Sequence, residues 1–498
     1  MAEAHMDYYS VISRFDPQRH EFYRYEFRWP ARLYHTVRLL IVAHGRPELG
    51  RVLEAVTTEL PYHISIDITT ARHASSRGPA GTDLTGFRFT TPDLVDYDQV
   101  WLVTTGGAPD LAPGELTALW AFMQGGGGVF ATGDGAGLYR RIPRVRGMRN
   151  WSRSSGAGAV PNSPVVVKPV HQPVGWPTLG RPDSAPHPVM CGRDGPITVL
   201  PQPSTRGRVE PAAAIDLTAG VDVEGTVVEE FPDDTAPTVI AVGAGADDDD
   251  EFNLVSAYDG HRAGVGRIVV DATGHHVFAA TVEQLAGPHD AVRAVISANG
   301  TPSVEQVSLA DHWRQIKDYF QNVAIWLGRA GSHDRVRRLG LLLAANHVDA
   351  LMTWQPQPID DPARRLPYLR ELGTRAQDAL HRFAPQRQRI DVTADLLHQL
   401  RMDDLATRWR LRLVDYRLVE QVALGGAVDA LHRAVSERDY ADLPGVRLDA
   451  IVRGGAAAAL GELTAELRAA VDMLGTLLVK GDEPPDPRHV VHSGHCVG

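Results

Sequence analysis

A carboxylate and two imidazoles of this sequence stand directly after apolar runs, where their side chains could do acid–base or metal chemistry. Asp134 lies between two glycines after the run Val129–Thr132, and His275 and His276 follow the run Gly266–Asp271. Such groups at one site supply a general acid and base, or ligands for a divalent metal ion. The sequence predicts Asp134, His275 and His276 as catalytic candidates. The structural alternatives are a helix cap at Asp134 and hydrogen-bonded core histidines at the pair.

A second set of residues is suited to holding a ligand. Glycines after neighbouring strands free backbone N–H groups for an anion or an oxyanion, and guanidinium groups bind phosphate or carboxylate through two parallel hydrogen bonds. The predicted binding residues are His44, Gly106, Gly107, Gly133, Gly135, Arg140 and Arg141. The alternatives are turn-forming roles for His44 and the glycines. For the arginine cluster of residues 140–149, the alternative is a solvated helix end with salt bridges.

The elements that must position these residues alternate between apolar strand patterns and helical patterns. The predicted strands are Val37–Ala43, Ile64–Thr69, Val100–Thr104, Val129–Thr132, Val239–Val242, Leu254–Ala257 and Gly266–Asp271, and the first two helices are Leu49–Leu60 and Pro113–Met123, with Glu115 suited to a first helical turn. This alternation predicts an α/β protein with a doubly wound, mostly parallel sheet of flavodoxin-like type. Ligands bind outside the carboxyl ends of the strands in such sheets, which is where the candidate residues lie.

The rest of the chain divides by composition and periodicity. We expect an N-terminal arm over 1–36 and the α/β domain over 37–330, with a loop-rich, Pro- and Gly-rich insertion at about 151–237 that lies over one end of the sheet. Residues 331–482 predict an all-helical domain, and 483–498 a flexible tail. The helices expected beyond the sheet are one that Ser308 caps, then Arg335–Met352, Pro367–Phe383, Ala394–Val414, Val422–Arg433 and Gly455–Leu478.

Composition excludes several classes of protein. The chain has 498 residues, a net charge of −11 and only two cysteines, so it is neither a disulfide scaffold nor a thiolate zinc protein. The negative charge argues against a broad nucleic-acid surface. No apolar run reaches the roughly 20 residues of a membrane span, and no signal peptide is visible. We therefore expect a cytoplasmic protein that binds neither nucleic acid nor membrane.

Three stretches together resemble a known superfamily. Asp98–Gly107 and the Gly-rich strand–turn GGGGVFATGDGAG are similar to the oxyanion strand and the nucleophile elbow of the class I glutamine amidotransferase-like superfamily, including its ThuA-like branch. Gly264–His276 resembles the late strand that carries the catalytic histidine in that superfamily. Four further segments, Ile142–Trp151, His187–Gly192, Val255–Arg267 and Ile316–Leu327, are similar to uncharacterised bacterial relatives. The resemblance covers about 37–327 and implies an amidotransferase-like fold.

The sequence departs from that superfamily at the residues that glutaminase chemistry needs. The elbow carries Asp134 in place of the nucleophilic cysteine, Cys191 lies far from it in sequence, and no glutamate follows His276 to complete a His-x-Glu pair. We therefore expect no glutaminase activity. Two hypotheses remain: a hydrolase-like or isomerase-like enzyme acting on a small anionic or carbonyl ligand, with a divalent metal ion left open as cofactor, and a catalytically inactive sensing or scaffolding protein. In the second, residues 331–482 bind a protein partner or associate with a second copy.

Overall fold

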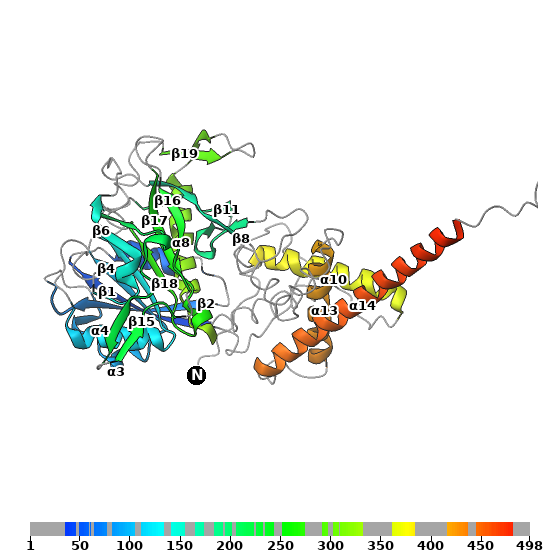
Figure 1. Cartoon of the computed structure of the whole chain (residues 1–498), viewed down its shortest axis with the longest axis horizontal. Helices are drawn as coiled ribbons and strands as arrows, with labels where there is room; N and C mark the ends of the chain where they lie inside the picture. Colours follow the sequence, from blue (N-terminus) through cyan, green and yellow to red (C-terminus); the bar gives the residue numbers. More distant parts are fainter. Residues whose placement is uncertain are drawn as a thin grey trace, which may run out of the picture. The chain divides into compact units, whose positions relative to one another are not determined.

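The structure, a computed structural model, covers the chain in stretches (Figure 1). It describes residues 35–45, 49–58, 60, 64–76, 82–104, 111–133, 141–154, 165–173, 184–192, 195–201, 206–223, 226–232, 235–243, 251–273, 291–296, 302–307, 309–331, 361–383, 416–436 and 445–481. The chain divides into two compact units: residues 1–343 with 379–394, called here the sheet unit, and 344–378 with 395–498, called the helical unit. The predicted domain boundaries stay predictions.

A ten-stranded mixed sheet forms the centre of the sheet unit. Its strands, in spatial order, are β12 (Val199–Leu200), β7 (Val165–Pro169), β16 (Thr238–Gly243), β17 (Phe252–Tyr258), β18 (Ile268–Asp271), β5 (Gly128–Gly133), β4 (Gln99–Thr104), β1 (His35–His44), β2 (Ile64–His73) and β3 (Leu84–Phe87). The six strands from β18 to β3 are parallel. The other four join antiparallel. The expected α/β class with a mostly parallel sheet is thereby confirmed.

Both faces of the parallel strands are buried under helices. On β1, Leu39 and Ile41 share one apolar cluster with helices α2 (Gly50–Thr57) and α8 (Leu309–Trp326). Leu40 and Val42 share the opposite cluster with α3 (Thr91–Leu94) and α4 (Pro113–Gln124). A central strand buried on both faces needs a continuous apolar sequence, which is what the run Leu39–Ala43 provides. Helices therefore cover both faces of β1.

The insertion predicted at about 151–237 contributes to the sheet as well as to loops. The sequence predicts short strands at Val165–Val167, Ile197–Leu200 and Thr226–Glu229, and β7, β12 and β15 lie there. The prediction did not include that β7 and β12 extend the antiparallel edge of the main sheet. Further short elements of the sheet unit pair outside the main sheet or form single turns. They are α6 (Val145–Met148), β6 (Arg149–Ser154), β8 (His171–Pro173), β9 (Ser184–Pro186), β10 (Cys191–Gly192), β11 (Gly195–Pro196), β13 (Arg206–Val209), β14 (Gly220–Val223), β15 (Thr226–Glu229), β19 (Ala291–Ile296) and β20 (Pro302–Val307).

The helical unit confirms the expected C-terminal helices and shows how they cross. Its described helices are α10 (Pro362–Phe383), α13 (Tyr416–Ser436) and α14 (Gly445–Gly481). A Cβ atom on Gly425 would lie 1.9 Å from the carbonyl oxygen of Leu369, and one on Gly426 would lie 2.5 Å from that of Gly455. The helices therefore touch backbone to backbone at two crossings. The helices predicted at Arg335–Met352 and Ala394–Val414 lie outside the described residues.

Candidate functional site

The carboxyl ends of the parallel strands carry the described part of the predicted site. β1 ends at His44, β4 at Thr104 and β5 at Gly133. Gly133 has φ = +94°, and a Cβ there would lie 2.0 Å from the carbonyl oxygen of Thr104, so only glycine fits. Arg141 is exposed. The other predicted residues lie outside the described part of the chain: Asp134, His275, His276, Gly106, Gly107, Gly135 and Arg140.

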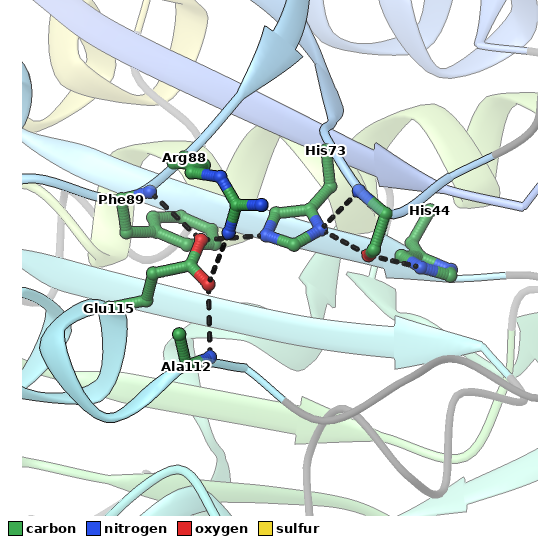
Figure 2. Close-up of polar contacts among 7 residues, drawn as sticks. His44, His73, Arg88, Phe89, Ala112 and Glu115 are labelled. Carbon is green, nitrogen blue, oxygen red and sulfur yellow. Dashed lines mark hydrogen bonds and ion pairs between the residues drawn. The ribbon is translucent and has the colours of Figure 1, made fainter.

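At this edge, His44 belongs to a row of four hydrogen-bonded side chains (Figure 2). His44 Nε2 lies 3.1 Å from Ser75 Oγ, and Ser75 Oγ lies 2.5 Å from His73 Nδ1. On the other side of the His73 ring, Nε2 lies 2.8 Å from Glu115 Oε1. His44, His73 and Glu115 are buried, whereas Ser75 is exposed in the turn that follows β2. We call His44, Ser75, His73 and Glu115 the carboxyl-edge row.

Glu115 anchors the row from the first turn of α4. Pro113 begins this helix, and the Glu115 carboxylate accepts the backbone N–H of Ala112 at 3.0 Å, as a glutamate at this helical position commonly does. The same carboxylate accepts the N–H of Phe89 at 3.3 Å and pairs with the Arg88 guanidinium at 3.6 Å. Burial disfavours its charge, but the hydrogen bonds from Ala112, His73 and Phe89 outweigh burial and lower the pKa of Glu115. Glu115 is therefore ionised at neutral pH.

The ionised carboxylate sets the direction of the hydrogen bonds along the row. Glu115 can only accept, so His73 Nε2 carries a proton. In the neutral ring, His73 Nδ1 is then an acceptor and takes the O–H of Ser75, along with the Ser75 backbone N–H at 3.3 Å. Because the serine hydroxyl is used in this way, the bond to His44 must come from the His44 Nε2–H group. The row thus runs from His44 to Ser75 to His73 to Glu115.

His44 is neutral over the whole physiological range of pH. Burial, followed by the positive charge that His73 can carry, lowers the pKa of His44 to about 4. Its ring lies 5.9 Å from that of His73. His44 Nδ1 is buried and has no hydrogen-bond partner within the described part of the chain. The His44 imidazole is thus joined to the polar row through Nε2 alone among the described residues.

A second buried polar cluster lies where β5 and β18 end. Asp271, at the end of β18, accepts hydrogen bonds from the Tyr319 hydroxyl at 2.7 Å, from the Thr273 hydroxyl at 3.0 Å and from the Thr132 hydroxyl. Burial raises the pKa of Asp271, although these hydrogen bonds oppose the shift. Gly133 N–H donates to the carbonyl of Thr273 at 3.2 Å. The cluster therefore holds together the two strand ends from which Asp134 and His275 continue.

Three arginines of the predicted cluster have structural partners. Arg149 is buried and donates to the carbonyl oxygens of Gly133 at 2.8 Å and Asp271 at 3.0 Å. The Arg144 guanidinium donates to the backbone carbonyl of the buried Glu230, and the Arg146 guanidinium pairs with the Glu230 carboxylate. Arg144 also lies over the Trp120 ring, 4.5 Å from its centroid, and burial lowers its pKa to about 10. Each of these three guanidinium groups therefore has a partner within the protein, Arg149 at the ends of β5 and β18 and the other two at Glu230.

Sequence reasoning missed three residues of the carboxyl-edge row. The strand predicted as Ile64–Thr69 extends to His73, so His73 and Ser75 occupy the carboxyl end of a strand and its following turn. Had the strand end been placed correctly, the rule that selected His44 would also have selected them. The sequence predicts Glu115 only as a residue of a first helical turn, and its spacing to His73 along the chain carries no signal.

The described residues show neither a metal-binding cluster nor a membrane-spanning helix. Over the residues that the structure describes, no three His, Cys, Asp or Glu side chains are grouped to hold a metal ion. None of the helices it describes is both long enough and apolar enough to cross a membrane.

Cys191 is buried and donates through its thiol to backbone carbonyls, as a small core residue does. No family model matches the sequence, and comparison with curated proteins gives no match.

Proposed function

We propose that this protein is a hydrolase-like enzyme that binds a small carbonyl or anionic ligand at the carboxyl ends of its parallel strands and lacks glutaminase activity. The observation that carries the proposal is the carboxyl-edge row. It joins a neutral imidazole, an exposed hydroxyl, a second imidazole and an ionised carboxylate at that edge. These are the groups of general acid–base catalysis at neutral pH.

The strand order supports an amidotransferase-like assignment of the fold. Taken without the short edge strand β3, the parallel strands run β2-β1-β4-β5-β18, which is the flavodoxin-like order 2-1-3-4-5. The direction of winding reverses between β1 and β4, and ligands in such sheets bind beside this switch point. His44 ends β1 there, next to Thr104 of β4. This position of His44 supports ligand binding at the row.

The absence of glutaminase activity is supported by the position of the cysteines. Asp134 follows Gly133 in the sequence where a glutaminase would need a thiol. Cys191 is 3% exposed and belongs to the short strand β10, outside the main sheet. A thiolate nucleophile at the elbow is thus missing from the chain's own residues, and the acid–base groups of the row remain.

A panel of hydrolase substrates tests this proposal on the full chain. Purified protein is assayed with carboxylic esters, amides, phosphomonoesters and glutamine, and the His44→Ala variant is run beside it. We expect turnover of a member of the first three classes, a loss of at least about tenfold in His44→Ala, and no release of ammonia from glutamine. Turnover of glutamine, or activity in one of the other classes that His44→Ala leaves unchanged, would contradict the proposal.

A second candidate function, scaffolding through the helical unit, is favoured by one surface. Leu467, Val471 and Leu474 recur on one face of α14 and are 42%, 66% and 60% exposed. A helix stripe of this spacing suits pairing with the same helix of a second copy. We expect light scattering to give twice the chain mass, and Leu467→Glu with Leu474→Glu to restore the single mass. Arg468→Glu, an exposed change beside the stripe, is the matched control. A monomeric wild-type chain would rule out the pairing.

A further inference from the structure

We propose that Ser75 is a nucleophile that forms an acyl-enzyme with carboxylic esters, with His73 as its base and Glu115 as the group that positions His73. This inference rests on the proposed hydrolase-like function and names its substrate class. The juxtaposition behind it is an exposed hydroxyl joined to a buried imidazole, which is joined in turn to a buried carboxylate. A nucleophile, a base and a group that orients the base, all within hydrogen-bond reach, are the recurring parts of an activated serine.

The protonation pattern of the row is the one that attack by a serine requires. His73 Nδ1, 2.5 Å from Ser75 Oγ, is the unprotonated nitrogen because Nε2 donates to Glu115. It can therefore take the hydroxyl proton as the oxygen attacks. Glu115 then faces an imidazolium and stabilises its charge across 2.8 Å. The accessible atom is the serine, while both groups that activate it are shielded from water.

His44 completes the arrangement around the serine oxygen. Its Nε2–H group donates to Ser75 Oγ at 3.1 Å and, with His73 Nδ1, fixes the orientation of the hydroxyl. Because the pKa of His44 is lowered to about 4, this ring stays neutral and adds no second cation beside the imidazolium that forms on His73. His44 is a positioning residue in this scheme.

The reaction balances with water as the only co-substrate. Ser75 Oγ forms a bond to the ester carbonyl carbon, and the hydroxyl proton passes to His73 Nδ1. The bond from that carbon to the alcohol oxygen breaks, and His73 returns the proton to the departing alcohol. Water then attacks the acyl-serine and gives a proton to His73, the carbon–Oγ bond breaks, and the proton returns to Oγ. The products are a carboxylic acid and an alcohol.

The contacts of Ser75 favour an acyl carbonyl over a phosphoryl group. Phosphoryl transfer depends on cationic side chains or metal ions that neutralise the charge of the phosphoryl oxygens. Within the described part of the chain, the Ser75 hydroxyl bonds only to imidazole nitrogens, and the nearby Arg88 is directed to Glu115. An uncharged ester carbonyl needs only the nucleophile, the base and hydrogen-bond donors. The row therefore suits a neutral acyl substrate.

The test combines covalent labelling with ester turnover. The full chain is treated with a fluorophosphonate probe and digested, and the labelled peptide is identified by mass; turnover of p-nitrophenyl acetate is measured in parallel. We expect the label on Ser75, and a loss of at least about 1,000-fold in turnover for Ser75→Ala. Ser76→Ala is the matched control, because the Ser76 hydroxyl bonds the Gly45 backbone and not the row. It should keep both the label and the turnover.

Two further variants separate catalysis from folding. Glu115→Gln should lower kcat about 100-fold or more while leaving KM unchanged, since it weakens the orientation of the base and not binding. If Ser75→Ala folds poorly, the Ser75→Cys variant still tests the assignment of Ser75 as the nucleophile. The thiol of this variant would lie beside His73. The pH midpoint of its reaction with iodoacetamide should therefore fall below the ordinary thiol pKa of about 8.5.

The outcomes distinguish this inference from the proposed function. Ester turnover that Ser75→Ala retains in full, or a label on another residue, overturns the assignment of Ser75 and leaves a hydrolase-like function standing. An unlabelled wild-type chain that turns over no substrate of the panel overturns both. Label on Ser75 without turnover of p-nitrophenyl acetate supports the nucleophile and shows that the acyl group of the substrate is larger or different.

Discussion

Replacing Asp271 with alanine is expected to lower the free energy of unfolding of the sheet unit by about 3–5 kcal/mol. The carboxyl group is fully buried and accepts hydrogen bonds from Tyr319, Thr273 and Thr132. Alanine leaves the Tyr319 and Thr273 hydroxyl groups in a buried site with no acceptor from residue 271, whereas the Thr132 hydroxyl keeps the carbonyl of Thr273 at 2.9 Å. Unpaired polar groups of this kind are costly, because neither water nor protein satisfies them.

Hydrogen exchange measured by mass spectrometry on the peptide that covers β18 reports this loss for the sheet unit alone. Asp271→Asn is the matched control, since its side-chain oxygen still accepts and its amide can donate to the Tyr319 oxygen; we expect a loss of about 1–2 kcal/mol. Tyr319→Phe removes one donor and should cost about 1 kcal/mol. If the β18 peptide is protected from hydrogen exchange as strongly in Asp271→Ala as in Tyr319→Phe, the cluster is not a stabilising network.

Acidification is expected to destabilise the sheet unit through His44. The ring has a pKa of about 4 in the folded protein, against 6.5 for an unperturbed histidine, so the unfolded chain binds the extra proton first as the pH falls. Stability from this group is therefore complete above about pH 6.5 and falls as the pH drops towards 4. Between pH 7 and pH 4.5 the loss is about 2 kcal/mol, from 1.36 kcal/mol for each pKa unit.

The measurement compares denaturant unfolding of wild type and His44→Asn at the two pH values. The variant lacks the titrating ring, so its stability should fall by about 2 kcal/mol less than that of the wild-type chain over the same interval. Subtracting the change in the variant from that in wild type removes the contributions of the carboxylates and other histidines that titrate in this range. His171→Asn, a change at an exposed histidine of β8, controls for the loss of an imidazole as such. Equal pH dependence in wild type and His44→Asn would contradict the lowered pKa.

The sheet was predictable from sequence because its central strands are buried on both faces. Continuous apolar runs such as the one in β1 have few alternatives, and their alternation with helices specifies an α/β sheet. The antiparallel edge was harder. Short strands are predicted where β7 and β12 lie, but their place in the main sheet depends on pairing with a strand that is distant in sequence. Such pairing leaves little local pattern.

The site was only partly predictable for the same physical reason. The carboxyl-edge rule selected His44 because a long apolar run ends there. The end of β2 was placed too early, since its Thr-rich, half-buried sequence lacks a sharp boundary, and this concealed His73 and Ser75. Glu115 enters the row through a contact between α4 and β2, and a single sequence does not encode such a contact in its spacing.

The carboxyl-edge row also has a consequence for the order of folding. Only the bond between His73 and Ser75 is local; the other two bonds close loops of 31 and 42 residues. Each closure carries an entropic cost that is recovered only when the flanking strands and α4 have docked. We therefore expect the complete row to form late in folding, once the strands of the native sheet and α4 have docked.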